Sequence, residues 1–251
     1  MALQLNLEKS KAALQLCLHK AGVTQPPVMD MGVLLDVSGS FEDEHQDGTT
    51  NRLLTRLIPW GLTFDPDGKL DVTTFSHGER HVHRVGSVSA GNYADFVQRQ
   101  IIGRVPGWNG GTDYSWGIED FLRLYGWVES SAKPVGLLGR LFGMKPEQGG
   151  AAVPGQRRRS LVTVITDGDN NDKDRTRQVL RASQARQDEV YVLFLGVSNQ
   201  DSRFPFLESV GDEFTNTGFV AIPDIRRFVA LADEELNELL LTEELVAWLK
   251  R

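Results

Sequence analysis

The sequence predicts an α/β fold: a doubly wound, mostly parallel six-stranded sheet with one antiparallel strand and helices on both faces. Short apolar segments typical of strands alternate with segments of helical period, as in a sheet that is covered on both faces. The two most strand-like segments, 31–36 and 160–166, lead into Asp36 and Asp167. Because sheets of this class bind ligands at the carboxyl ends of their strands, these two ends are candidate functional positions.

Six segments carry the strand pattern. They are residues 31–36, 69–76, 80–85, 160–166, 190–195 and 218–222. Only His77-Gly78-Glu79 separates the second segment from the third, so we expect these two strands to pair antiparallel. The remaining connections are long enough to hold helices, and we expect the other strands to be parallel.

Helical period appears between and after these strands. It covers residues 51–64, 91–103, 113–127 and 172–186, a short stretch around Phe206-Leu207, and residues 224–250. Residues 5–21 also fit a helix, but Leu14 to Leu18 alternates like a strand, so this segment stays open. Residues 132–159 lose all periodicity among prolines and glycines, which indicates a surface insertion.

Length and composition fit one domain. The chain has 251 residues, of which 40% are hydrophobic and 24% charged, and no linker divides it into two halves. We expect the domain to span residues 28–231 with the insertion at 132–159. Residues 1–27 would form an N-terminal extension, and residues 232–251 a C-terminal helix packed on the same domain.

Several classes of function are disfavoured by composition. A formal net charge of −7 argues against non-specific nucleic-acid binding, which needs a basic face. The single cysteine, Cys17, excludes an internal disulfide and a thiolate-rich zinc site. The sequence has neither an apolar stretch of about 20 residues, which a membrane span needs, nor a secretory signal. We therefore expect a cytoplasmic protein; nothing in the sequence sets its oligomeric state.

The first strand predicts a metal site. The apolar run ends at Asp36, and Ser38 and Ser40 follow on a sharp turn. If the strand order is 3-2-1-4-5-6, the order reverses between strands 31–36 and 160–166, and Asp36 faces Asp167 across the crevice. Two buried carboxylates repel each other, and a divalent cation resolves that conflict.

Hydroxyl groups supply further oxygen ligands. Ser38 and Ser40 are joined by Thr112, which follows Gly110-Gly111 on a loop that glycines allow to approach closely. Hard oxygen ligands of this kind suit Mg²⁺, Mn²⁺ or Ca²⁺. The alternative interpretation is that Asp36, Ser38 and Ser40 only cap the following helix.

Other polar residues receive structural interpretations. We expect Asp169 to Asp172 to cap helix 172–186, and Asp113 to cap its own helix. Glu42 to His45 are expected in a solvated loop. His77, His81 and His83 are expected on the surface, the last two on one face of a strand. Trp108 is either a contact for a partner or a lid over the core.

Three motifs together carry a resemblance. Asp36-Val37-Ser38-Gly39-Ser40, Gly110-Gly111-Thr112 and Thr166-Asp167-Gly168 resemble the metal-ion-dependent adhesion site of von Willebrand factor A-type domains, a Rossmann-like fold. The likeness covers roughly residues 28–231. Further stretches resemble the bacterial branch linked to tellurite resistance and stress response: Arg56 to Pro59, Phe64 to Val72, Thr166 to Asn170, Phe219, Leu239-Leu240 and Trp248. Phe41 departs from the methionine of many relatives, which we expect to change only packing.

The resemblance implies a function. Asp36, Ser38 and Ser40 correspond to metal ligands or their near surroundings, Thr112 ligates in the ligand-bound form, and Asp167 acts directly or through water. The expected ion is Mg²⁺, although Ca²⁺ or Mn²⁺ fits the same ligands. Its open position takes an Asp or Glu carboxylate from a partner protein. The chain is thus predicted to be a binding module with no catalytic residues, rather than an enzyme.

Two other functions compete with this one. A metal-dependent phosphohydrolase could use Asp36 as nucleophile. Such enzymes usually carry a second aspartate two residues later, where this chain has Ser38, and no lysine lies in an obvious phosphate-clamping motif. A structural domain with a vestigial site is disfavoured because all five ligand positions are intact.

Overall fold

The computed structural model describes residues 2–129, 157–198 and 203–251, and it confirms the predicted fold class. Its six-stranded sheet has the order β3-β2-β1-β4-β5-β6, with every neighbouring pair parallel except β2 and β3. The strands are β1 (Met29–Asp36), β2 (Leu70–Phe75), β3 (His83–Val88), β4 (Arg159–Thr166), β5 (Val190–Val197) and β6 (Thr217–Ile222). The order therefore reverses between β1 and β4, as the sequence predicted.

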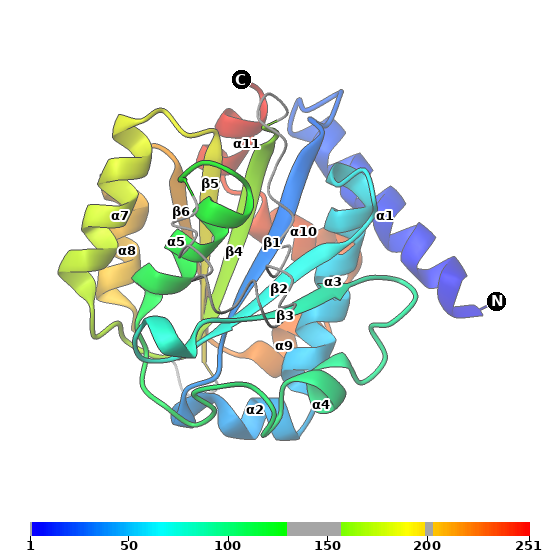
Figure 1. Cartoon of the computed structure of the whole chain (residues 1–251). Coiled ribbons are helices and arrows are strands. Elements are labelled where there is room, and N and C mark those ends of the chain that lie inside the picture. Colours follow the sequence, from blue (N-terminus) through cyan, green and yellow to red (C-terminus); the bar gives the residue numbers. More distant parts are fainter. Residues whose placement is uncertain (1, 130–156, 199–202) are drawn as a thin grey trace, which may run out of the picture.

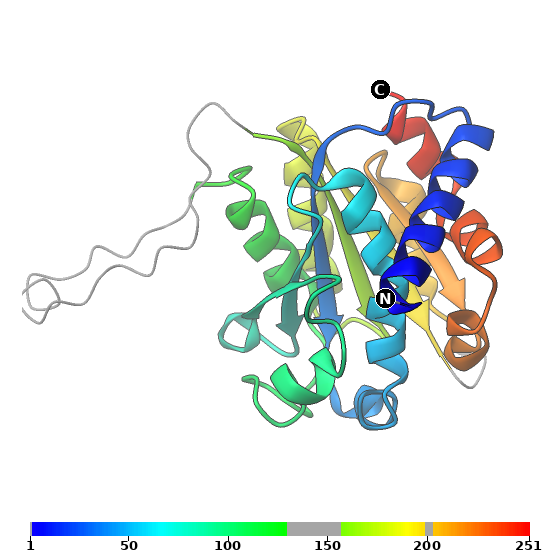
Figure 2. The same cartoon turned by 90° about the vertical axis from the view of Figure 1, so that its right-hand side faces the viewer.

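Helices cover both faces of the sheet (Figures 1 and 2). One face carries α1 (Ala2–Lys20), α3 (Thr49–Phe64), α9 (Ile225–Val229), α10 (Asp233–Leu240) and α11 (Glu243–Leu249). The other face carries α5 (Tyr114–Leu124), α7 (Lys173–Ala185) and α8 (Pro205–Glu213). The short elements η1 (Gly39–Phe41), α2 (Glu42–Gln46), η2 (Glu79–His81) and α4 (Phe96–Gln100) complete the list. The inner strands alternate between the two cores: Met31 and Val33 of β1 face one, and Leu34 the other.

Helix α5 packs on β1 through two reciprocal glycine contacts. A Cβ added to Gly32 of β1 would lie 2.5 Å from the Phe121 ring of α5, and one added to Gly117 of α5 would lie 2.5 Å from Leu34 of β1. Protein cores are close-packed, so neither position has room for a methyl group. The two glycines therefore let α5 lie directly on β1, which places the start of α5 beside the end of that strand.

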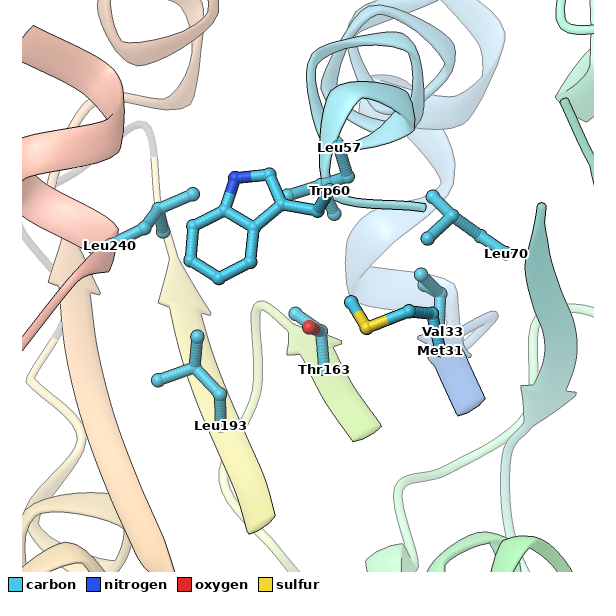
Figure 3. A pocket seen from close by; sticks show the side chains of 8 residues that line it. All are labelled: Met31, Val33, Leu57, Trp60, Leu70, Thr163, Leu193 and Leu240. Atoms are coloured by element: carbon cyan, nitrogen blue, oxygen red, sulfur yellow. The ribbon is translucent and has the colours of Figure 1, made fainter. Parts of the chain in front are cut away.

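On the opposite face, Trp60 anchors α3 to the sheet. Figure 3 shows its indole pointing from α3 toward the strands, between Leu240 of α10 on one side and Met31 on the other. Trp60 is only 2% exposed, and its Nε1 donates a hydrogen bond of 2.9 Å to Oδ1 of the buried Asn237. This polar contact links α3 to the C-terminal helices.

The two ends of the chain settle an open point and correct a prediction. Residues 5–21 belong to a helix, α1, which buries Leu14 and Leu18 and exposes 43% of Leu16. Residues 224–250 do not form one helix; they form three, α9, α10 and α11. The apolar period continues through these breaks, which is why the sequence pattern missed them.

The third strand starts and ends later than predicted. It begins at His83 rather than residue 80, because residues 79–81 form η2, and it extends to Val88. His81 and His83 therefore do not share a strand face. The predicted insertion at 132–159 lies almost wholly outside the described residues.

Among the residues that the structure describes, none of the helices combines the length and apolarity needed to cross a membrane.

Candidate functional site

The predicted site residues lie on three loops at the carboxyl ends of β1 and β4. Asp36 is the last residue of β1, Ser38 and Ser40 follow it, Asp167 follows β4, and Thr112 lies two residues before α5. The Ser38 and Ser40 hydroxyls are 3.3 Å apart, and Ser40 Oγ donates a hydrogen bond of 2.9 Å to Asp167 Oδ1.

Thr112 reaches the same point from the third loop. A Cβ placed on Gly168 would lie 3.5 Å from Thr112 Oγ1 and 3.8 Å from Ser40 Oγ. A larger side chain at this position would fill the space between the two hydroxyls. Gly168 therefore keeps that space open, and the three loops present their oxygens around it.

Asp36 is the most deeply buried group of the site. Its side chain is 0% exposed; Oδ1 accepts from the Ser38 backbone N–H at 2.8 Å and Oδ2 accepts from Thr166 Oγ1 at 2.6 Å. Burial, with a smaller contribution from the charge of Asp167, raises the pKa of Asp36 to about 7 despite these bonds. The carboxylate is thus ordered but poorly solvated, which favours a nearby cation or a proton.

Asp167 is perturbed in the same direction. Burial raises the pKa of Asp167 to about 6 against the hydrogen bond from Ser40, and the charge of Glu44 on α2 adds to the rise. Two neighbouring carboxyl groups therefore both have raised pKa values, because burial disfavours their negative charge. A divalent cation between them would offset this cost of burial. The helix-capping alternative does not explain the raised pKa values, and neither Ser38 nor Phe41 makes a side-chain cap for η1 or α2.

The glycine-rich loop is bound directly to the loop after β1. Asn109 N–H donates to Val37 O at 2.9 Å, and Gly39 N–H donates to Gly110 O at 3.1 Å. Asn109 has a φ of 61°, in the left-handed region that asparagine tolerates better than most residues. Its side chain donates to Glu42 Oε2 at 2.8 Å, so Glu42 supports this loop rather than being free in solvent.

His45 is a residue of this region that sequence reasoning missed. It was expected in a solvated loop but is 0% exposed, with Nε2 2.9 Å from Asp36 O and Nδ1 2.9 Å from Thr50 Oγ1. Because a carbonyl only accepts, Nε2 carries the proton and Nδ1 accepts from Thr50. Burial lowers the pKa of His45 to about 4, so the ring is neutral. Its contact with Trp108, at 5.3 Å between ring centroids, makes that half-buried tryptophan a cover over His45.

The structure corrects two capping predictions: neither Asp113 nor Asp172 makes a side-chain cap at the start of its own helix. Asp113 occupies the N-cap position of α5 but makes no side-chain cap; its Oδ2 accepts from Gly78 N–H at 2.7 Å. Asp172 instead receives the first N–H groups of α5, from Tyr114 at 3.1 Å and Ser115 at 3.2 Å. No local sequence signal identifies a cap that comes from a loop more than 50 residues away.

The histidines next to the glycine loop make no metal cluster. His77 is exposed and its ring contacts that of His81 in a tilted arrangement, with 4.4 Å between centroids and 55° between ring planes; His81 Nδ1 donates to His77 O at 2.6 Å. No group of three or more His, Cys, Asp or Glu side chains suited to a metal occurs in the described part of the chain. The candidate site differs from such clusters because its donors are two carboxylates and three hydroxyls, a set suited to hard cations.

Comparison with known proteins supports the fold and the family. Residues 28–138 match the family model vWA-TerF-like, described as the vWA found in the C terminus of TerF. The uncharacterized protein YcbR of Bacillus subtilis (strain 168) is 25% identical over 250 residues, covering 97% of this chain and 86% of YcbR.

Two solved structures show the same fold at low sequence identity. Proximal thread matrix protein 1 from the mussel byssus matches with a TM-score of 0.51 and 16% identity over 86% of this chain, which spans about half of that protein (48%). The N-terminal domain of TFIIH p34 matches with a TM-score of 0.50 and 12% identity, over 82% of this chain and 95% of that domain. The sheet order and the three loop motifs agree with a von Willebrand factor A-type domain, and residues 28–138 are similar to the TerF-like kind of that domain.

Proposed function

We propose that the protein is a divalent-metal-dependent binding module that docks a carboxylate of a partner protein at the crevice between β1 and β4. The observation that carries this proposal is the pair of carboxyl groups, Asp36 and Asp167, with raised pKa values beside three hydroxyls. Asp36, Ser38, Ser40, Thr112 and Asp167 would hold the ion. We expect Mg²⁺, with Mn²⁺ or Ca²⁺ as ions of the same ligand class.

The bound ion would supply an electrophilic centre that accepts one more anionic ligand from a partner. The chain's own residues prepare for this. Thr166 and the Ser38 N–H fix the orientation of the Asp36 carboxylate, and Ser40 fixes that of Asp167. Gly168 keeps the space among the hydroxyls free of side-chain atoms. With only two anionic ligands, a divalent ion held here would favour a further anionic ligand, such as an incoming Asp or Glu side chain.

No observation favours the phosphohydrolase alternative. Both oxygens of the Asp36 carboxylate accept hydrogen bonds in a fully buried position, which is unsuited to a nucleophile that must reach a substrate. The proposal extends to a cytoplasmic setting in bacterial stress response or tellurite resistance, which is supported by the TerF-like match alone.

The first test measures whether an ion binds. Thermal unfolding of the wild type would be followed in EDTA and in millimolar Mg²⁺, Mn²⁺ or Ca²⁺, alongside Asp36→Asn and Thr112→Ala. Binding at 100 times the dissociation constant stabilises the folded state by about 2.7 kcal/mol, so we expect a clear rise in Tm for the wild type. Asp36→Asn should lose this rise, and an equal rise in wild type and Asp36→Asn would contradict the proposed ligand set.

A second test concerns the docked group. Peptides selected from a random library on the immobilised protein in Mg²⁺ should each contain an Asp or Glu residue. Replacing that residue by Asn or Gln, or adding EDTA, should abolish binding, and Thr112→Ala should weaken it. Selected peptides that bind equally well in EDTA, or that lack a carboxylate, would contradict carboxylate docking.

A further inference from the structure

The first turn of α5 depends on a carboxylate from another loop. The N–H groups at the start of a helix have no partner within it, and here Tyr114 N–H donates to Asp172 Oδ1 at 3.1 Å and Ser115 N–H to Asp172 Oδ2 at 3.2 Å. The Ser115 hydroxyl also donates to Oδ2. Asp172 thus caps α5 in place of Asp113, whose carboxylate accepts a hydrogen bond from Gly78 N–H instead.

The loop that carries Asp172 holds the segment before α5 at two further points. Asn171 N–H donates to the carbonyl of Thr112 at 2.9 Å. The Tyr114 hydroxyl donates to Gly168 O at 2.6 Å. The first bond is made by Thr112 itself and the second by Tyr114, two residues later, and the loop that receives them begins with Asp167. The backbone of Thr112 is therefore tied to the loop that supplies Asp167.

Both oxygens of Asp172 are already used by protein donors. Besides the groups of α5, Thr176 Oγ1 donates to Oδ1 at 2.8 Å, and the Asp172 N–H donates to Asn170 Oδ1 at 2.9 Å. Arg175 Nη1 donates to Ser115 Oγ at 2.5 Å, which supports the hydroxyl that contacts Oδ2. A carboxylate with four donors has little capacity left for an ion, so its role differs from that of Asp36 and Asp167.

We propose that Asp172 is a positioning residue of the site: its carboxylate clamps the first turn of α5 to the loop after β4 and thereby holds Thr112 beside Asp167. This inference rests on the function proposed above. Residues that orient metal ligands typically change metal affinity by about 10- to 100-fold when they are removed. The clamp explains how two of the three loops, those of Thr112 and Asp167, keep their oxygens together before a ligand arrives.

The test uses the full chain with Mn²⁺ as probe, because free Mn²⁺ is counted directly by its electron paramagnetic resonance signal. Asp172→Ala removes both side-chain oxygens that accept these hydrogen bonds, and Asp172→Asn keeps one of them. The matched control is Thr242→Ala, which removes the cap of α11, where Thr242 Oγ1 accepts from Leu245 N–H at 3.3 Å. Figure 1 shows α11 at the opposite end of the molecule from α2, which adjoins the site.

We expect Asp172→Ala to weaken Mn²⁺ binding by about 10-fold or more, Asp172→Asn to weaken it less, and Thr242→Ala to leave it within about twofold, all measured well below their Tm. Hydrogen exchange should also speed up at the Tyr114 and Ser115 amides in Asp172→Ala alone.

If Asp172→Ala binds Mn²⁺ as tightly as the wild type, or if exchange at these amides is unchanged, the positioning role is overturned. The proposed function then stays intact, provided that Asp36→Asn loses Mn²⁺ binding. Failure of the wild type to bind Mn²⁺ would overturn the proposed function and, with it, the role of the clamp in that function. An equal loss of affinity in Thr242→Ala would show that general stability, and not the clamp, sets the affinity, which also overturns the inference.

Discussion

Replacing Asp36 by Asn should remove the loss of stability with rising pH that this buried carboxyl group causes in the wild type. Burial raises the pKa of Asp36 in the folded chain to about 7, against about 3.9 in an unfolded chain. The folded state therefore binds the proton more tightly. The stability gained from that proton is fully present below pH about 4 and is lost as the pH rises through 7.

The size of the effect follows from these two values. Each pH unit between them changes the free energy of unfolding by about 1.4 kcal/mol for one proton, so the wild type should lose about 2 kcal/mol relative to Asp36→Asn between pH 5 and pH 7. Asn fits the same space: its oxygen can accept from Ser38 N–H, and its amide can donate to Thr166 Oγ1, whose hydroxyl also accepts.

The assay is urea unfolding of both proteins in EDTA at pH 5, 6, 7 and 8. The difference between the two curves isolates Asp36, because Asp167 and His45 titrate in both proteins. A divalent ion should stabilise the wild type more at pH 8 than at pH 5, since its carboxylate ligands must be deprotonated. A difference that is independent of pH, or a wild type that gains stability relative to Asp36→Asn between pH 5 and 7, would refute the reasoning.

Two further changes test the packing that positions the site. Gly32→Ala should destabilise the protein by about 1–3 kcal/mol in urea unfolding through its clash with Phe121. Gly91→Ala, whose Cβ would make an ordinary contact of 3.7 Å with Ser89 Oγ, should change stability little; equal effects would disprove close packing of α5 on β1. Asn237→Ala should cost about 1–3 kcal/mol because the buried Trp60 N–H loses its acceptor, and an unchanged midpoint with an unchanged fluorescence maximum would show that this N–H finds another partner.

Much of the fold could be predicted because its signals are local. The apolar runs that end at Asp36 and Asp167 identify β1 and β4 as buried strands, and general rules of sheet topology place their carboxyl ends together. Three hydroxyl positions followed from short motifs next to these strands and from a glycine-rich loop. In the structure Ser40 contacts Asp167, and Thr112 lies beside Gly168; that these residues hold a metal stays a prediction.

Where a segment fitted both the helical and the strand pattern, the sequence did not decide between the two structures. Leu14, Leu16 and Leu18 would share one face of a strand, whereas a helix turns Leu16 to the other side. Packing of α1 against α3 and α10 decides for the helix, and the Ser10 hydroxyl donates to Asp233 of α10 at 2.7 Å. At the C-terminus, Thr242 in front of two glutamates was a usable signal for a new helix.

The sheet, its switch point and the types of oxygen donor near it can be predicted from local patterns, because hydrophobic period and turn residues act over a few neighbours. Which polar groups are buried, and which residues hold them, depends on how whole elements pack. His45 is neutral because a distant loop covers it, and Asp172 caps α5 rather than its own helix because the chain brings residues 114 and 172 together. Such partners are set by the packing of whole elements, which short-range patterns do not contain.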